Sequence, residues 1–103
     1  MIVRIVQMSF RAGERDNFLQ LFEERKELIR GFEGCRHLEL WEDTHNDHIF
    51  FTYSMWDSEQ HLNHYRFSDL FKDTWARTKA LFADKPQAWS VLQKMVVNNV
   101  KNA

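Results

Sequence analysis

The chain has 103 residues, a length typical of one domain, and its formal net charge at pH 7 is −1. The near balance of 14 basic and 15 acidic residues gives no electrostatic reason to expect binding to nucleic acid or to an anionic membrane. Aromatic residues make up 15% of the chain, more ring surface than one small core needs, so we expect an aromatic pocket, a subunit interface, or both.

The cysteine and hydropathy patterns favour a cytoplasmic location. Cys35 is the only cysteine, so an intrachain disulfide cannot form. The first residues lack the long apolar stretch of a signal peptide, and apolar runs such as residues 49–51 are far too short to cross a membrane. We therefore expect a cytoplasmic protein without a membrane partner.

The first half of the chain alternates between strand and helix patterns. Residues 2–10 are rich in β-branched residues, with apolar side chains at both parities, which predicts a strand buried on both faces. Residues 14–30 carry apolar side chains at helical spacing and are followed by two glycines that end the helix. Residues 35–43 and 48–56 flank a polar turn, which predicts a hairpin.

The second half begins with a short helix over residues 59–66, capped by Asp57 or Ser58. A longer amphipathic helix follows, with a predicted buried stripe that runs from Phe67 to Phe82. Residues 88–97 predict the last strand, and residues 98–103 a frayed tail. We therefore expect a single domain over residues 1–97.

The predicted order β-α-β-β-α-β is that of a ferredoxin-like α+β fold with an antiparallel sheet. Its helices can cover only one face of a four-stranded sheet, although the strands carry apolar residues on both faces. Packing the uncovered face on a second copy is the simplest way to remove it from water. The sequence therefore predicts a homodimer.

Histidines are the first candidates for proton transfer, because their ordinary pKa of about 6.5 suits a general base. His61 and His64 lie three residues apart on the short helix, where they either reach a pocket or stay on the solvated face. We favour His64, because it precedes the apolar residue Phe67 by one turn. His37 lies on the second strand, where it lines a pocket or a dimer face or has no functional role.

The sequence predicts no metal or cofactor site. His45 and His48 bracket the hairpin turn, and a flexible turn does not supply the converging ligands and ordered second shell of a metal centre. Cys35 has no evident partner that would lower the pKa of its thiol. The three glycines of the chain form no phosphate-binding motif.

Aromatic and small polar side chains are the candidates for a substrate pocket between sheet and helices. A flat aromatic ligand there would touch Trp56 and Trp75, whose indole N–H groups could hold an oxyanion. Thr52 and Ser54 share the parity of Trp56, and their small side chains would leave room for the ligand. The expected binding set also includes the phenylalanines Phe50 and Phe71. The alternative is that these rings form a solid core.

Several short motifs occur together in a characteristic order. Phe32-Glu33-Gly34-Cys35 leads into the second strand, and Trp56-Asp57-Ser58 closes the third. Further motif positions are Leu62, Tyr65, Ser68, Leu70, Phe71, Ala80-Leu81-Phe82-Ala83, Lys85-Pro86 and Trp89. Over residues 2–92 the chain resembles the antibiotic biosynthesis monooxygenase (ABM) family of dimeric α+β barrels.

The resemblance implies oxygen insertion into a small electron-rich aromatic molecule, a quinol or an anthrone, without metal, flavin or other cofactor. A base would remove a proton from the substrate, and the resulting anion would transfer an electron to oxygen. His61 and His64 stand where a quinol-oxidising member carries histidines. In the haem-degrading branch of the fold, Trp56 matches a tryptophan, but the haem-ligating histidine falls at Trp75, which argues against haem degradation.

Two other functions fit the same fold, which hosts many chemistries. A non-catalytic small-ligand-binding or stress-response dimer is favoured by the lack of an unmistakable catalytic constellation in the sequence. An isomerase or mutarotase would use histidine and tyrosine to move protons on a sugar or a lactone.

Overall fold

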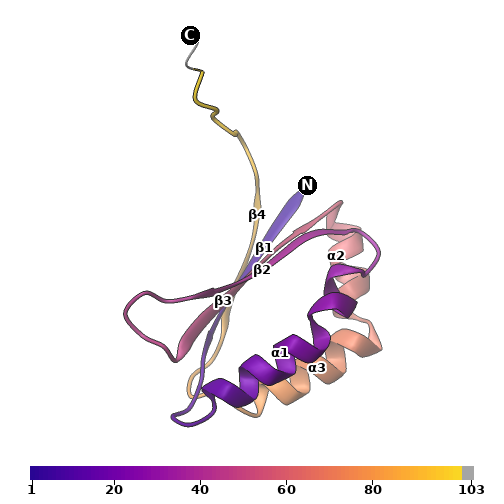
Figure 1. Cartoon of the computed structure of the whole chain (residues 1–103). Coiled ribbons are helices and arrows are strands. Elements are labelled where there is room, and N and C mark those ends of the chain that lie inside the picture. Colours follow the sequence, from indigo (N-terminus) through magenta and orange to yellow (C-terminus); the bar gives the residue numbers. More distant parts are fainter. Residues whose placement is uncertain (101–103) are drawn as a thin grey trace.

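The computed structural model describes residues 1–100, which form a sheet with a layer of helices beside it (Figure 1). The elements in chain order are β1 (Ile2–Ser9), α1 (Arg15–Arg30), β2 (Cys35–Glu42), β3 (Ile49–Trp56), α2 (Glu59–Arg66), α3 (Asp69–Lys79) and β4 (Gln87–Leu92). Every expected element is present, with a short and a longer helix in the second half. The predicted ferredoxin-like α+β fold is confirmed.

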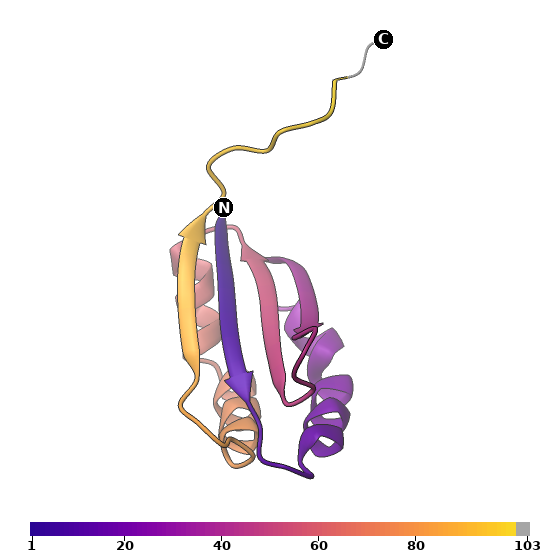
Figure 2. The ribbon, with the colours of Figure 1, turned by 90° about the vertical axis from the view of Figure 1, so that its left-hand side faces the viewer.

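The four strands form one antiparallel sheet in the order β2-β3-β1-β4, so β1 lies between β3 and β4. Its register places Ile5 opposite both Tyr53 and Trp89. Because alternate residues of a strand point to opposite faces, the even-numbered residues of these three strands share one face and the odd-numbered residues share the other. The helices lie behind one face, and no other part of residues 1–100 covers the opposite one (Figure 2).

Two serine caps decide where the helices of the second half begin. The Ser58 hydroxyl accepts a hydrogen bond from the His61 N–H, and the Ser68 hydroxyl accepts one from the Phe71 N–H. The cap at Ser68 starts α3 two residues later than the predicted stripe. Phe67 therefore lies at the junction and is 75% exposed, so its predicted burial is wrong. None of the helices within residues 1–100 is long and apolar enough to cross a membrane.

The last strand is shorter than the sequence pattern predicts. We expected strand structure over residues 88–97, but β4 ends at Leu92. Leu92 pairs with Ile2, the first residue of β1, so the following residues have no neighbouring strand to bond to. Residues 93–100 lead away from the sheet (Figure 1). Of the expected tail, residues 101–103 lie outside the described part of the chain.

The helix-covered face of the sheet holds two clusters of buried side chains. One contains Met8, Phe10, Phe18 and Phe50, which we call the phenylalanine cluster. The other contains Ile29, Cys35, Trp56, Leu62 and Tyr65, which we call the Trp56 cluster. Strand β3 joins them, because it begins beside the first and ends in the second. Between the clusters, the same face of β3 carries only Thr52 and Ser54.

Candidate functional site

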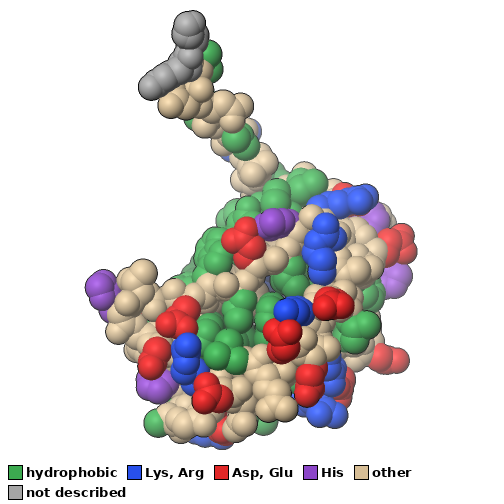
Figure 3. Space-filling model, in the orientation of Figure 1, with side chains coloured by type: hydrophobic (Ala, Val, Ile, Leu, Met, Phe, Trp, Pro, Cys, Tyr) green, Lys and Arg blue, Asp and Glu red, His purple; other side chains and the backbone are tan. Residues whose placement is uncertain are grey.

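A cavity of about 240 Å³ lies between the sheet and the helices. Its sheet wall consists of helix-facing residues from the four strands, and its other wall comes from α1, α2 and α3. Hydrophobic side chains line a hollow between these layers, with charged side chains around its rim (Figure 3). This is an apolar site of the kind that binds small molecules.

The alternation along β3 explains why the cavity lies at this position. Trp56 and Phe50 are large and almost completely buried, whereas Thr52 and Ser54 between them are small. The small pair lines the cavity together with Trp56, whose indole Nε1–H donates a hydrogen bond of 3.0 Å to Ser54 Oγ. Phe50 does not line it, because its ring is enclosed by Phe10 and Phe18 at centroid distances of 5.9 and 5.3 Å.

Helix α3 provides the aromatic wall opposite the sheet. Phe71 and Trp75 are one turn apart, and their rings stack with centroids 5.8 Å apart at an angle of 13°. Both rings line the cavity. Five of the six residues predicted to bind substrate line the cavity: Thr52, Ser54 and Trp56 in the sheet wall, and Phe71 and Trp75 in the helix wall. The sixth, Phe50, belongs to the solid core. Their role in binding stays a prediction.

His61 lies at a structural junction outside the cavity. Its side chain packs against Gly34, where a Cβ atom would overlap with the His61 ring, and Gly34 has a φ of +87°. Its Nδ1 is 2.7 Å from Ser58 Oγ, in the cap of α2. The Gly34 carbonyl accepts a hydrogen bond from the Asp57 N–H, which joins the start of β2 to the end of β3. Two of the motifs that carry the family resemblance, residues 32–35 and 56–58, therefore meet here.

His64 and His37 also lie outside the cavity walls. His64 is exposed on α2 and approaches the Phe32 ring edge-on, at a centroid distance of 5.7 Å. The argument for His64 depended on a buried Phe67, and that residue is exposed. His37 lies on the uncovered face of the sheet, where its Nε2 is hydrogen-bonded to Glu39 and its ring meets Tyr53 edge-on. The three predicted catalytic histidines are therefore not brought together.

The titratable groups that do line the cavity are Arg4, Tyr65 and Arg66, none of which the sequence reasoning placed in a pocket. Burial raises the pKa of the Tyr65 phenol well above its ordinary value, so this side chain is no base at neutral pH. A signal for Arg4 was present in the sequence, because it interrupts the run Ile2, Val6 and Met8 on the helix-facing side of β1. Arg66 gave no such signal, since it ends a short polar helix.

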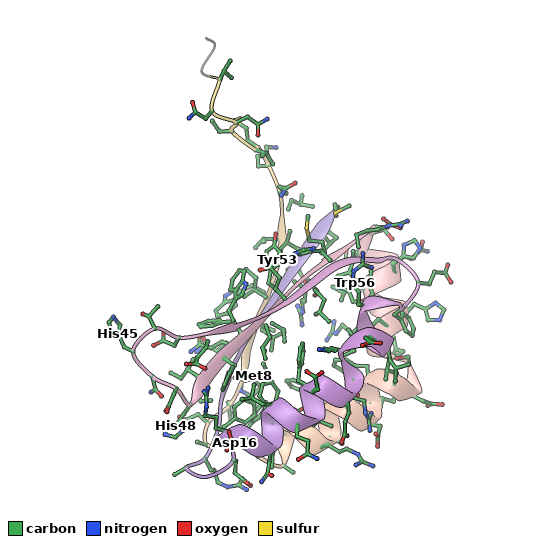
Figure 4. All side chains as sticks on the ribbon, viewed as in Figure 1. Met8, Asp16, His45, His48, Tyr53 and Trp56 are labelled. Atoms are coloured by element: carbon green, nitrogen blue, oxygen red, sulfur yellow. The ribbon has the colours of Figure 1, made fainter. Side chains whose placement is uncertain are left out.

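The remaining polar candidates are Cys35 and the two histidines of the hairpin turn, His45 and His48. Among residues 1–100 no group of three or more His, Cys, Asp or Glu side chains is placed to hold a metal ion. The hairpin turn that carries His45 and His48 projects from the sheet, whereas Met8 and Trp56 lie on its helix side (Figure 4). Burial raises the pKa of the Cys35 thiol, which disfavours the thiolate needed for nucleophilic attack.

Comparisons with known proteins identify the family. The model of the antibiotic biosynthesis monooxygenase family matches residues 1–77. No curated protein matches the sequence significantly. A solved antibiotic biosynthesis monooxygenase superposes with a TM-score of 0.83 at 19% identity, over 88% of this chain and 96% of that one.

Two further solved structures have the same fold. A conserved protein from Methanosarcina mazei Go1 superposes with a TM-score of 0.85 at 19% identity, over 91% of this chain and 94% of that one. A Mycobacterium tuberculosis protein superposes with a TM-score of 0.84 at 16% identity, over 94% of this chain and 98% of that one. Identities this low support the fold alone, whereas the family model covers most of the chain. The chain therefore belongs to the antibiotic biosynthesis monooxygenase (ABM) family.

Proposed function

We propose that the chain is a cofactor-independent monooxygenase that oxidises a small electron-rich aromatic molecule with O₂. The observation that carries this proposal is the aromatic-walled cavity of about 240 Å³ between β3 and α3. An apolar cavity of roughly 150 Å³ already accommodates benzene. The larger cavity therefore has room for a fused-ring substrate, which is the size class of quinols and anthrones.

The proposed reaction needs no external reductant. An anthrone or quinol anion gives one electron to O₂, and the two radicals combine into a peroxide at the ring carbon. Loss of water from that peroxide leaves a carbonyl group. The substrate as a whole loses two hydrogens, both from the reacting carbon of an anthrone or one from the ring carbon and one from a hydroxyl group of a quinol, and gains one oxygen atom. The second oxygen atom leaves as water, so the substrate supplies all four electrons.

The cavity residues would stabilise the anion and exclude water. The Ser54 hydroxyl oxygen accepts a hydrogen bond from the Trp56 indole N–H. The hydroxyl proton of Ser54 therefore stays available to donate to a substrate oxygen. Thr52 offers a second hydroxyl on the same wall. Because His37, His61 and His64 lie outside the cavity walls, the substrate in this proposal loses its proton to solvent on entry rather than to a histidine.

Oxygen uptake tests the proposal directly. Anthrone and 1,4-naphthoquinol should each consume oxygen faster with the protein than without it, and each oxygen molecule taken up should give one molecule of oxygenated product. A Thr52→Leu variant, whose longer side chain would project into the cavity where the ring should lie, should abolish the difference. Phe67→Ala, at an exposed position outside the cavity, is the control. A folded protein that accelerates neither reaction would contradict the proposal.

We also propose that the protein works as a homodimer through the uncovered face of the sheet. Ile5, Tyr53, Trp89 and Val91 point to this face, and Trp41 of β2 stacks on Tyr53 with ring centroids 4.8 Å apart. Trp89 and Val91 are 43% and 45% exposed in the single chain. A contiguous apolar surface of this kind is unfavourable in water unless a partner covers it.

Analytical ultracentrifugation tests the dimer. The wild-type protein should sediment as a dimer at micromolar concentration, and Trp89→Lys should shift it to the monomer, because the new charge would be buried in the interface. Phe67→Lys places the same charge at another exposed aromatic position and should leave the dimer intact. A wild-type protein that stays monomeric at these concentrations excludes this interface.

A second candidate is a non-catalytic ligand-binding protein. The observation that favours it is the chemistry of the cavity walls, whose titratable groups are two arginines and a buried tyrosine, none of them a base at neutral pH. Binding of an aromatic ligand without oxygen uptake would support this function over the first.

A further inference from the structure

Two arginines stand together at one end of the cavity. Arg4 comes from the helix-facing side of β1, and Arg66 is the last residue of α2. The Arg4 guanidinium donates a hydrogen bond of 2.9 Å to Ser90 Oγ. Neither arginine takes part in any ion pair among residues 1–100, and no aspartate or glutamate lines the cavity.

The surroundings make this pair of charges unfavourable without a counter-ion. Arg4 is half-buried. Its burial, together with the positive charge of Arg66, lowers the pKa of Arg4 below the ordinary value, although a guanidinium stays charged at neutral pH. Arg66 itself is exposed, and from its position in the cavity lining its positive charge repels that of the half-buried Arg4. An anion placed between them would remove this repulsion.

The same end of the cavity is open to solvent. Ala88 and Ser90 have the parity of the helix-facing side of β4, yet both are exposed. Ala88 lines the cavity, and Ser90 holds the Arg4 side chain. A ligand can therefore enter past the edge strand β4 with its apolar part first and leave its polar group beside the arginines.

We infer that the cavity binds aromatic anions, with the ring between the walls that carry Trp56 and Trp75 and the anionic oxygen paired to Arg4 and Arg66. Guanidinium groups recognise carboxylates and other oxyanions through directed, charge-assisted hydrogen bonds. This inference rests on the proposed aromatic ligand of the same cavity, but it does not require any reaction with oxygen. A carboxylate and a phenolate share the chemistry that the arginines recognise.

Binding of matched probes to the full chain tests the inference. The probes are 2-naphthoate, the neutral 2-naphthamide, and 2,4-dinitrophenolate as the phenolate, titrated by calorimetry. We expect 2-naphthoate to bind at least about tenfold more tightly than 2-naphthamide, since one charge-assisted hydrogen bond corresponds to roughly a factor of ten or more. Added salt should weaken the naphthoate complex and leave the naphthamide complex unchanged.

Variants assign the effect to the two arginines. Arg4→Met and Arg66→Met should each weaken naphthoate binding about tenfold and leave naphthamide binding within about twofold, which also shows that the cavity is intact. Lys72→Met is the matched control, because it removes one charge from an exposed position of α3 that does not line the cavity. Comparison of naphthoate with dinitrophenolate then identifies the preferred anionic group.

The outcomes separate this inference from the proposed reaction. Equal affinities for naphthoate and naphthamide, or arginine variants that bind naphthoate as the wild type does, would overturn the anion site even if the protein consumes oxygen. Arginine-dependent naphthoate binding without oxygen uptake on any substrate would support the anion site and count against the monooxygenase.

Discussion

The helix-covered face of the sheet is solid at the phenylalanine cluster and hollow from Thr52 toward the Trp56 cluster; we call these two parts the solid end and the hollow end. In the phenylalanine cluster, the Phe10 and Phe18 rings stack with centroids 4.2 Å apart, and Phe50 closes the cluster beside them. Two and four residues further along β3, Thr52 and Ser54 have the same orientation but leave a cavity. Small side chains therefore replace large ones at alternate positions of β3, and a cavity forms there in place of a packed core.

The two ends also differ in charge. At the phenylalanine cluster, the Arg15 guanidinium lies 5.2 Å from the centre of the Phe50 ring and pairs with the Glu42 carboxylate. The hollow end has Arg4 and Arg66 in its walls. Half-buried charges without a carboxylate partner reduce stability, and charged groups in such perturbed environments cluster at functional sites. We infer that the solid end supplies stability and the hollow end supplies binding.

The strongest test of this comparison removes one ring from each end. Phe18→Ala should lower the free energy of unfolding by about 3–5 kcal/mol, because the Phe18 ring is 2% exposed and stacks on Phe10, although one side of it also borders the cavity. Phe71→Ala should cost about 1–2 kcal/mol, since Phe71 is only partly buried and already borders a cavity. Urea denaturation measures both values. Equal losses would mean that the two ends are packed alike.

The junction at Gly34 provides the next largest effect. Gly34→Ala should lower the free energy of unfolding by about 2–3 kcal/mol, because the left-handed backbone is strained for alanine and the new Cβ would collide with His61. Gly13→Ala is a matched control, since Gly13 has a φ of +86° and no atom within 4 Å of the added Cβ. It should cost about 1 kcal/mol.

The two glycine variants separate strain from contact. Their difference, measured by thermal and urea unfolding, reports the contact between Gly34 and His61 alone. If both variants lose the same stability, the His61 side chain can move aside. The contact between Gly34 and His61 would then contribute little to the free energy of unfolding.

Local patterns were sufficient to predict the order and type of the elements. The helical spacing of residues 14–30 and the polar turn between residues 35–43 and 48–56 do not depend on the rest of the chain. The end of β4 could not be predicted in this way, because it depends on where β1 begins at Ile2. Phe67 was misplaced because the Ser68 cap competes with the apolar stripe, and here the cap prevails.

The candidate site was only partly predictable, because part of it depends on contacts between residues that are distant in sequence. The shared parity of Thr52, Ser54 and Trp56 follows from strand geometry, and these residues line the cavity. Phe50 has that parity too, but its burial depends on Phe18, which is distant in sequence. Arg4 and Arg66 meet only in the folded chain, so no spacing rule relates them.

A narrowed cavity tests the hollow end with a smaller effect on stability. Thr52→Leu should change the free energy of unfolding by less than about 1 kcal/mol, because the longer side chain enters space that is already empty. The same variant should no longer bind 2-naphthamide. Its counterpart at the solid end, Phe50→Trp, should destabilise by about 1–3 kcal/mol through overpacking. A Thr52→Leu variant that still binds the probe would place the ligand elsewhere.

The smallest expected effect concerns a surface ion pair at the hollow end. Arg36 donates two hydrogen bonds of 2.7 Å to the Asp57 carboxylate, and these bonds hold the pKa of Asp57 below its ordinary value. A lowered folded-state pKa stabilises the fold at a pH above the unfolded-state pKa of about 3.9, and this contribution is lost as the pH falls through the folded-state pKa. Asp57→Asn should therefore flatten the acid side of the stability curve.

Urea midpoints measured between pH 2 and pH 7 would test this, with Arg36→Met as the control that removes the partner and leaves the carboxylate. Both variants should lose less stability than the wild type on acidification, and both should lie slightly below it at neutral pH. Because the pair is exposed, its effect should be smaller than that of either interior substitution. Parallel curves for wild type and variants would show that this junction is held by Gly34 and the Ser58 cap rather than by charge.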